Sequence, residues 1–153
     1  MKSFFLLIIA FSVCSGLLSQ TWFLFSGNKL TIDNNSIRRV VSCSGDSISS
    51  ELLGLSGSGR NFLRAGSPEF RFLINGITID GSSGWTIGEC RPASDAEGGK
   101  GASLILNGKG PAVGILLEIT YFSYPGLPLI RKKIAFTNKS TADMNLEAVD
   151  IEN

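Results

Sequence analysis

The sequence contains no histidine, and it has only three cysteines and two methionines in 153 residues. The absence of His removes the most common general base and the most common transition-metal ligand, which argues against a Ser–His hydrolase and against a zinc site. Lys and Arg number 14, Asp and Glu number 13, and neither sign forms a long run. Because nucleic-acid binding needs a concentrated basic stripe, we expect no nucleic-acid partner, and we expect no metal and no cofactor.

Apart from the N-terminus, no apolar run is long enough to span a membrane. The first residues have the pattern of a secretory signal peptide, with Lys2 as the positive end and an apolar segment from Phe4 to Phe11. A small residue at Ser19 permits cleavage before Gln20. We therefore predict a signal peptide over residues 1–19, a single domain over residues 20–153 and no membrane span after cleavage, in a secreted or periplasmic protein.

Two alternatives remain for the N-terminus. The uncharged stretch from Phe4 to Phe25 is long enough to cross a bilayer as a helix, and it would then anchor the protein in a membrane. Cys14 would instead carry a lipid if the protein were a lipoprotein, although Val13 is larger than the residue usually found before a lipidated Cys.

Removal of the signal leaves two cysteines, Cys43 and Cys90, in an oxidising compartment. A disulfide between them would close a loop of about 47 residues and contribute about 4 kcal/mol through the unfolded state. The alternative is a pair of buried free thiols, and the sequence does not decide between the two.

The pattern of the chain predicts an antiparallel all-β sandwich. It has 18 Gly residues and repeated short apolar runs separated by turn signals, and it shows no amphipathic helix of three turns. The clearest hairpin is Glu69 to Asp80, with Asn75 and Gly76 as a type I′ turn. We expect further strand pairs at 29–33 with 37–44, at 102–106 with 112–124 and at 129–137 with 146–152, and a strand at 47–55.

Two segments rich in Gly, 56–67 and 81–101, are expected to be surface loops, which often carry function when they are this long. The second contains Trp85 among Gly, Ser and charged residues. An exposed aromatic ring stacks on the apolar face of a sugar, so Trp85 is a weak candidate for carbohydrate contact. The alternative is that Trp85 fills the edge of the sandwich beside Cys90.

No catalytic residues emerge from the sequence. A glycosidase needs two carboxyl groups about 5 to 10 Å apart, and sequence alone pairs none. We expect Glu69, Glu118 and Asp150 to be the solvent-facing partners of apolar residues in alternating strands. The charged residues of the 81–101 segment show no spaced carboxylate pattern and predict a solvated loop rather than a calcium site.

The segment YFSYPGLPLIRKKIAFTNKSTADMNLEAVDIE, residues 121–152, resembles the amino-terminal β-supersandwich domain of family 36 glycoside hydrolases, the α-galactosidase type. In that family a strand ending near a Tyr leads through a proline-containing turn into a Pro-x-Ile-Arg-like strand, and a polar hairpin then leads to an apolar strand with an acidic end. The matching residues here are Tyr124, Leu127, Pro128, Leu129, Ile130, Arg131, Asn138, Leu146 and Asp150.

The resemblance implies a supporting role. In the family, a (β/α)₈ barrel after the sandwich supplies the catalytic Asp residues and nearly all of the sugar contacts, and such a barrel alone needs about 250 residues. We therefore expect this chain to be the non-catalytic sandwich, or a fragment, of a secreted α-galactosidase-like hydrolase whose barrel partner handles the α-galactoside. A free-standing secreted carbohydrate-binding or surface interaction module is the alternative.

Overall fold

A computed structural model describes residues 22–151 of the chain. Within this range the protein is all-β, with three open antiparallel sheets, and the only helical element described is a short 3₁₀ turn, η1 (Gly110–Ala112). The predicted all-β class is therefore confirmed. The predicted signal peptide, residues 1–19, lies outside the described residues, as does Cys14.

The first half of the chain forms a five-stranded sheet in the order β1-β2-β3-β4-β5. Its strands are β1 (Phe23–Ser26), β2 (Lys29–Asp33), β3 (Ile37–Ser42), β4 (Ser49–Leu55) and β5 (Ser67–Pro68). The predicted pairing of 29–33 with 37–44 is confirmed, because β2 pairs with β3 across a turn that contains Asn34 and Asn35. The Asn34 amide also donates to the carbonyl oxygens of Tyr124 and Leu127, at 2.7 and 2.8 Å, and so ties this hairpin to the next sheet.

The second sheet has four strands in the order β11-β10-β9-β8. They are β8 (Trp85–Ser94), β9 (Lys100–Gly108), β10 (Ile115–Ser123) and β11 (Ile130–Asn138). The predicted pairing of the segments on either side of residues 107–111 is confirmed, because β9 and β10 pair in register from Leu116 opposite Asn107.

Strand β8 corrects the prediction that residues 81–101 are a surface loop. Within this segment, Trp85–Ser94 form a ten-residue strand that pairs with β9, and a register shift lies between Ile87 and Glu89. This bulge breaks the alternation of inward and outward side chains, because one extra residue is inserted on the bulged strand. Trp85, Ile87 and Cys90 all contact the core, but their spacing of two and then three residues hides the strand from a period-2 pattern.

The third sheet contains β12 (Leu146–Asp150), β6 (Arg71–Ile74) and β7 (Ile77–Asp80), in that order. The β6–β7 hairpin is confirmed, and Asn75 and Gly76 both have positive φ, 49° and 74°, as a type I′ turn requires. Gly is suited to this position because it has no Cβ to clash.

The predicted pairing of residues 129–137 with 146–152 is wrong. Strand β11 pairs with β10, whereas β12 pairs with β6. Polar contacts between the β6–β7 turn and the start of β12 hold this arrangement: Asn75 and Asn145 exchange hydrogen bonds of 3.0 and 2.9 Å, and the Glu147 carboxylate accepts from the Gly76 amide at 2.9 Å. The loop between β11 and β12 therefore carries the chain from the four-stranded sheet to the three-stranded sheet.

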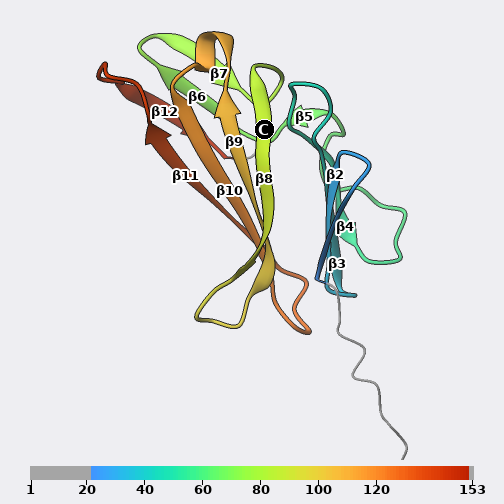
Figure 1. The fold of residues 1–153 in the computed structure, drawn as a ribbon. Coiled ribbons are helices and arrows are strands. Elements are labelled where there is room, and N and C mark those ends of the chain that lie inside the picture. The colour runs from blue at the N-terminus through green and yellow to red at the C-terminus, as the bar shows by residue number, and fades with distance from the viewer. Residues whose placement is uncertain (1–21, 152–153) are drawn as a thin grey trace, which may run out of the picture.

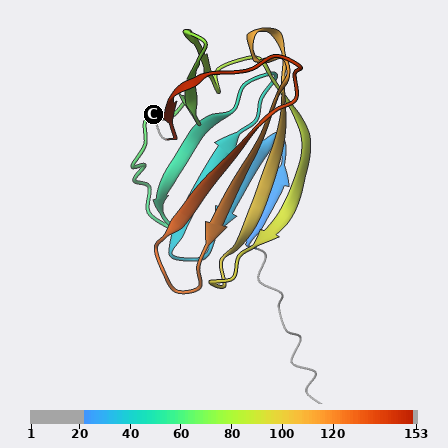
Figure 2. The ribbon, with the colours of Figure 1, turned by 90° about the vertical axis from the view of Figure 1, so that its left-hand side faces the viewer.

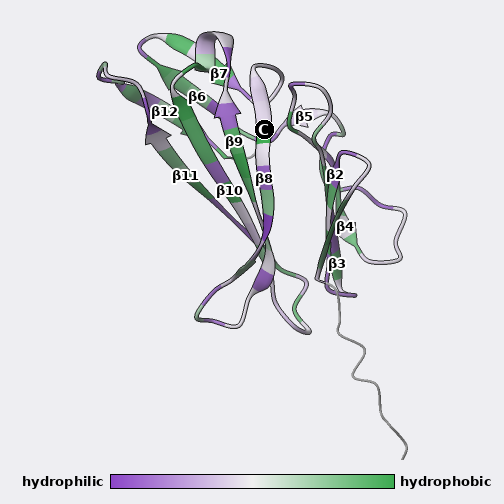
Figure 3. Ribbon diagram, viewed as in Figure 1, coloured by the Kyte–Doolittle hydropathy of each residue, from purple (hydrophilic) through white to green (hydrophobic). Residues whose placement is uncertain are grey.

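All three sheets contribute to one apolar core. Figure 1 shows the four-stranded sheet facing the five-stranded sheet, with β12 beside β11 and the β6–β7 hairpin at the same end of the molecule, and Figure 2 shows the four-stranded sheet face-on in front of the five-stranded sheet. Hydrophobic residues colour long parts of β9 and β10 in Figure 3. The largest fully buried apolar side chains are Trp85, Tyr121, Phe70, Phe72, Leu30, Ile32, Ile48, Leu104, Leu106, Leu117 and Ile119.

Candidate functional site

The densest polar chemistry in the described residues surrounds the carboxylate of Glu69, which is 0% exposed between the sheets. It accepts hydrogen bonds from Arg39 Nη2 at 2.8 and 3.0 Å, and from the hydroxyls of Tyr121 at 2.6 Å and Ser50 at 2.5 Å. The Lys132 ammonium lies 2.8 Å from the same carboxylate. We call these five side chains the buried charge cluster.

The charge balance of the buried charge cluster keeps Glu69 ionised. Burial by itself would raise the pKa of Glu69, but the nearby charges of Arg39 and Lys132, with hydrogen bonds from Lys132 and Ser50, outweigh it and lower the pKa. A general acid of a glycosidase needs a raised pKa and contact with its substrate. Glu69 has neither property, so it joins β3, β4, β10 and β11 rather than performing acid catalysis.

The expectation that Glu69 faces solvent is therefore wrong. Cations and hydroxyls from four strands, β3, β4, β10 and β11, converge on the Glu69 carboxylate and compensate for its burial. Glu118 and Asp150 do follow the expectation. The side chain of Glu118 is 34% exposed, and Asp150 lies on an exposed strand.

A second candidate site lies on the outer face of the four-stranded sheet. Ile119 and Tyr121 point into the core, so the alternate residues of β10 point to the opposite face. Strand register then aligns one row of polar side chains across all four strands, Lys133, Thr120, Ser103 and Arg91, and a second row of Arg131, Phe122, Gly101 and Ala93.

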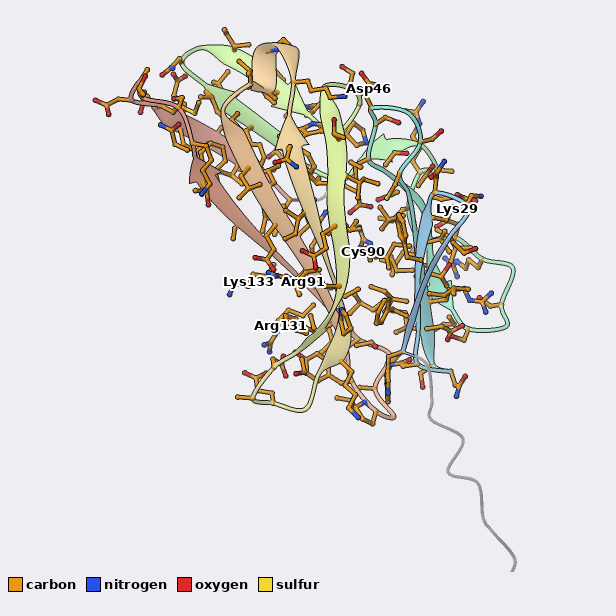
Figure 4. All side chains as sticks on the ribbon, in the orientation of Figure 1. Lys29, Asp46, Cys90, Arg91, Arg131 and Lys133 are labelled. Atoms are coloured by element: carbon orange, nitrogen blue, oxygen red, sulfur yellow. The ribbon has the colours of Figure 1, made fainter. Side chains whose placement is uncertain are left out.

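Small side chains at the middle of these rows and long charged ones around them leave a depression of about 360 Å³. We call it the outer-face hollow. Figure 4 labels Arg91, Arg131 and Lys133 on this side of the sheet, away from the five-stranded sheet. The hollow is lined by Arg91, Pro92, Ala93, Ser94, Ser103, Glu118, Thr120, Phe122, Lys133 and Ala135.

The hollow holds one ion pair and one hydroxyl pair. Arg91 donates to the Glu118 carboxylate at 2.9 Å, and the Ser103 and Thr120 hydroxyls lie 2.7 Å apart. The hydrogen bond from Arg91 is the main reason that the pKa of Glu118 lies below its ordinary value, and the charge of Lys133 acts in the same direction. The Lys133 ammonium makes no hydrogen bond or ion pair with any residue between 22 and 151.

The charged loop after β8 is organised by ion pairs. Asp95 accepts a 2.6 Å hydrogen bond from the Tyr124 hydroxyl, which lowers the pKa of Asp95, and Arg131 contacts both Asp95 and Glu97. No group of three or more His, Cys, Asp or Glu side chains within residues 22–151 is placed to hold a metal ion.

Trp85 is in the core, where it is 1% exposed. Its ring meets Phe70 edge to face at 5.1 Å between centroids, and its indole N–H donates to the Asp80 carbonyl at 2.7 Å. A sugar needs an open ring face for stacking, and this ring offers none. The alternative interpretation, in which Trp85 fills the edge of the sandwich, matches this packing.

Cys43 and Cys90 are both free thiols in the structure, and a disulfide between them stays a prediction. Cys43 is buried and Cys90 is half-buried against the same core. Burial raises the pKa of the Cys43 thiol to about 12, with smaller contributions from Cys90 and Glu69. Burial also raises the pKa of Cys90.

Comparison with known proteins assigns no family to this chain. No family model, curated protein or solved structure matches it significantly. Within residues 22–151, no helix is long and apolar enough to cross a membrane.

Proposed function

We propose that this chain is the non-catalytic amino-terminal β-sandwich domain of a secreted α-galactosidase-like glycoside hydrolase, and that it supports a catalytic barrel. The proposal follows from the resemblance of residues 121–152 to the supersandwich domain of family 36 glycoside hydrolases. The all-β fold with antiparallel sheets is consistent with such a domain.

The observation that carries the proposal is the exposed apolar surface of β12. All five residues of this strand are exposed, and Leu146 and Val149 keep 42% and 48% of their surface in solvent, followed by Ile151 at 50%. Apolar side chains grouped on one strand favour contact with another folded body. A neighbouring domain packed on β12 would bury them.

The state of the carboxylates supports a non-catalytic role. Glu69 is buried and ion-paired, and Glu118 is held by Arg91 beside the outer-face hollow. No second carboxylate lines that hollow. Two carboxyl groups flanking one substrate, which both retaining and inverting glycosidases use, are therefore lacking there.

Two measurements test this proposal. The purified chain is expected to hydrolyse no aryl α-galactoside, and turnover that follows the protein peak through chromatography would refute a non-catalytic role. The coding region downstream of the codon for Asn153 is expected to encode barrel strands with paired Asp residues. A stop codon there, together with a stable folded product, would refute the supporting role.

The outer-face hollow favours a second candidate function, a free-standing secreted carbohydrate-binding module. Its charged and hydroxyl-bearing side chains surround a small apolar floor, as in many sites for polar ligands. Under this function the chain binds sugar without a barrel, and binding depends on Lys133 or Glu118 rather than on Trp85. Under the first candidate function, by contrast, the chain is expected to be less stable without the barrel domain that packs on β12.

A further inference from the structure

The outer-face hollow combines an exposed ammonium, Lys133, that has no ion-pair partner among residues 22–151, hydroxyl groups and an apolar floor, and we propose that it binds a hexuronate, a sugar ring that carries one carboxylate. The inference deepens the second candidate function and rests on it. It leaves the first candidate function untouched, since a sandwich that supports a barrel is equally able to hold a sugar on its outer face.

The charges of the hollow call for one negative charge on the ligand. Arg91 and Glu118 already neutralise each other at 2.9 Å. Lys133 is exposed on the opposite wall and has no ion-pair partner in the described part of the chain. A ligand carboxylate beside Lys133 forms a charge-assisted hydrogen bond, which is about twice as strong as a neutral one.

The polar groups between these walls suit sugar hydroxyls. The Ser103 and Thr120 hydroxyls are hydrogen-bonded to each other at 2.7 Å, and Ser103 also donates to the Glu118 carboxylate, so both hydroxyl hydrogens are used and the remaining lone pair of Thr120 is available to a ligand as an acceptor. The Glu118 carboxylate accepts from Arg91 and keeps further lone pairs, because an ionised carboxylate has about four acceptor sites. The hollow thus offers acceptors on Glu118 and Thr120 together with the Lys133 ammonium as a donor.

The floor of the hollow suits the C–H face of a pyranose. Phe122 lies at one end of the hollow and is 8% exposed, with Gly101 and then Ala93 next to it in the register, and Ala135 lies at the other end opposite Glu118. Small side chains there let a flat ring approach the sheet. The volume of about 360 Å³ is at the lower end of the range for small-ligand sites, about 300–1,000 Å³, which fits one sugar ring and not a long chain.

The same features disfavour the simpler ligands. A neutral sugar offers the Lys133 ammonium hydroxyl acceptors but no negative charge, so it lacks the stronger charge-assisted hydrogen bond. A plain anion such as acetate uses Lys133 but leaves the hydroxyl pair and Glu118 without a ligand contact, and it gains nothing from the floor. Preference for a hexuronate over both is therefore the distinguishing property of the site.

The test is an NMR titration of the ¹⁵N-labelled full chain with galacturonate and with glucuronate, using galactose and acetate as matched probes. Either uronate is expected to shift the amides of Ser103 and Thr120 and to bind at least tenfold more tightly than galactose or acetate. Lys133→Met is expected to weaken uronate binding about tenfold, the effect of one charge-assisted hydrogen bond at an exposed site. Lys139→Met, in the exposed loop after β11, is the control and should change nothing.

Each contrary outcome identifies what fails. Equal binding of acetate and uronate overturns the inference in favour of a simple anion site. Galactose that binds at the same amides as tightly as uronate overturns the hexuronate while keeping the carbohydrate-binding module. No shift with any sugar overturns both, and it leaves the supporting role to be judged by the α-galactoside assay and the downstream reading frame. A well-dispersed spectrum of Lys133→Met shows that any loss is not due to unfolding.

Discussion

Replacement of Glu69 by Gln tests whether the buried charge cluster holds the sheets together. The substitution keeps the shape of the side chain but removes its charge, and it places an NH₂ group where an oxygen accepts hydrogen bonds. Arg39, Lys132, Tyr121 and Ser50 all donate to this carboxylate. An amide has only one oxygen to offer them, so at least one donor loses its acceptor.

The expected loss is large because two cations stay buried. The side chains of Arg39 and Lys132 are only 3% and 5% exposed. Removing one partner of a buried ion pair costs about 3–5 kcal/mol, mainly because it leaves uncompensated charge away from water. For a domain of about 130 residues this lowers the melting temperature by about 10–20 °C, and it removes a large part of a typical stability of about 5–15 kcal/mol.

The assay is urea unfolding of the chain followed by circular dichroism, with Glu51→Gln as the control. Glu51 pairs with Lys29 at 2.7 Å, but both side chains are exposed, by 40% and 50%. An exposed pair contributes about 0–1 kcal/mol, so the control should stay close to the unmodified protein. A loss below about 1 kcal/mol for Glu69→Gln would refute the reasoning, because it would mean that the carboxylate does not compensate two buried cations.

The pH dependence of stability gives an independent check on Glu69. Its pKa in the folded protein lies below the ordinary value of 4.5, so the folded state favours the ionised form. The stabilisation from this group is therefore fully present above pH 4.5 and is lost as the pH falls through the folded pKa. Unfolding titrations between pH 7 and pH 3 should show this loss in the unmodified protein and a smaller one in Glu69→Gln. Equal slopes would contradict the assignment.

Two further predictions concern the thiols and one glycine. The pKa of Cys43 is raised to about 12, so Cys43 should resist iodoacetamide at pH 8 in the folded chain, whereas half-buried Cys90 should react slowly. Both thiols should react in urea, and peptide mapping that finds Cys43 modified first in the folded chain would contradict the prediction. Gly101→Ala should destabilise the chain by about 1–3 kcal/mol, because the added Cβ would lie 2.0 Å from the Tyr121 carbonyl oxygen. Gly59→Ala is the control, since its Cβ would meet no atom within 4 Å. Equal melting temperatures of the two variants would contradict the prediction.

The sequence predicted the strands whose side chains alternate without interruption. The β6–β7 hairpin was predicted with its turn, because Asn75 and Gly76 are the residues that tolerate positive φ at adjacent positions. Strand β8 was missed because a bulge after Ile87 shifts the alternation by one residue. A pattern search with a fixed period cannot find a strand whose period changes midway.

The candidate site depended more strongly on the tertiary structure. The outer-face hollow combines residues of β8, β9, β10 and β11, and only the strand register places Lys133 and Arg91 in one row with the hydroxyls between them. The polar neighbours of Trp85 in the sequence predicted an exposed ring, but the indole packs against Phe70 in the core and donates to the Asp80 carbonyl.

The sequence by itself determined the all-β class, the clearest hairpin turn and the absence of histidine, because these follow from side-chain alternation, backbone freedom and residue inventory, which are local properties. Only the tertiary structure decided that Glu69 is buried and that β12 pairs with β6 instead of β11. The physical reason is that burial of a charge and choice of a strand partner depend on groups far away in the chain: Arg39 and Tyr121 compensate Glu69 from 30 and 52 residues away.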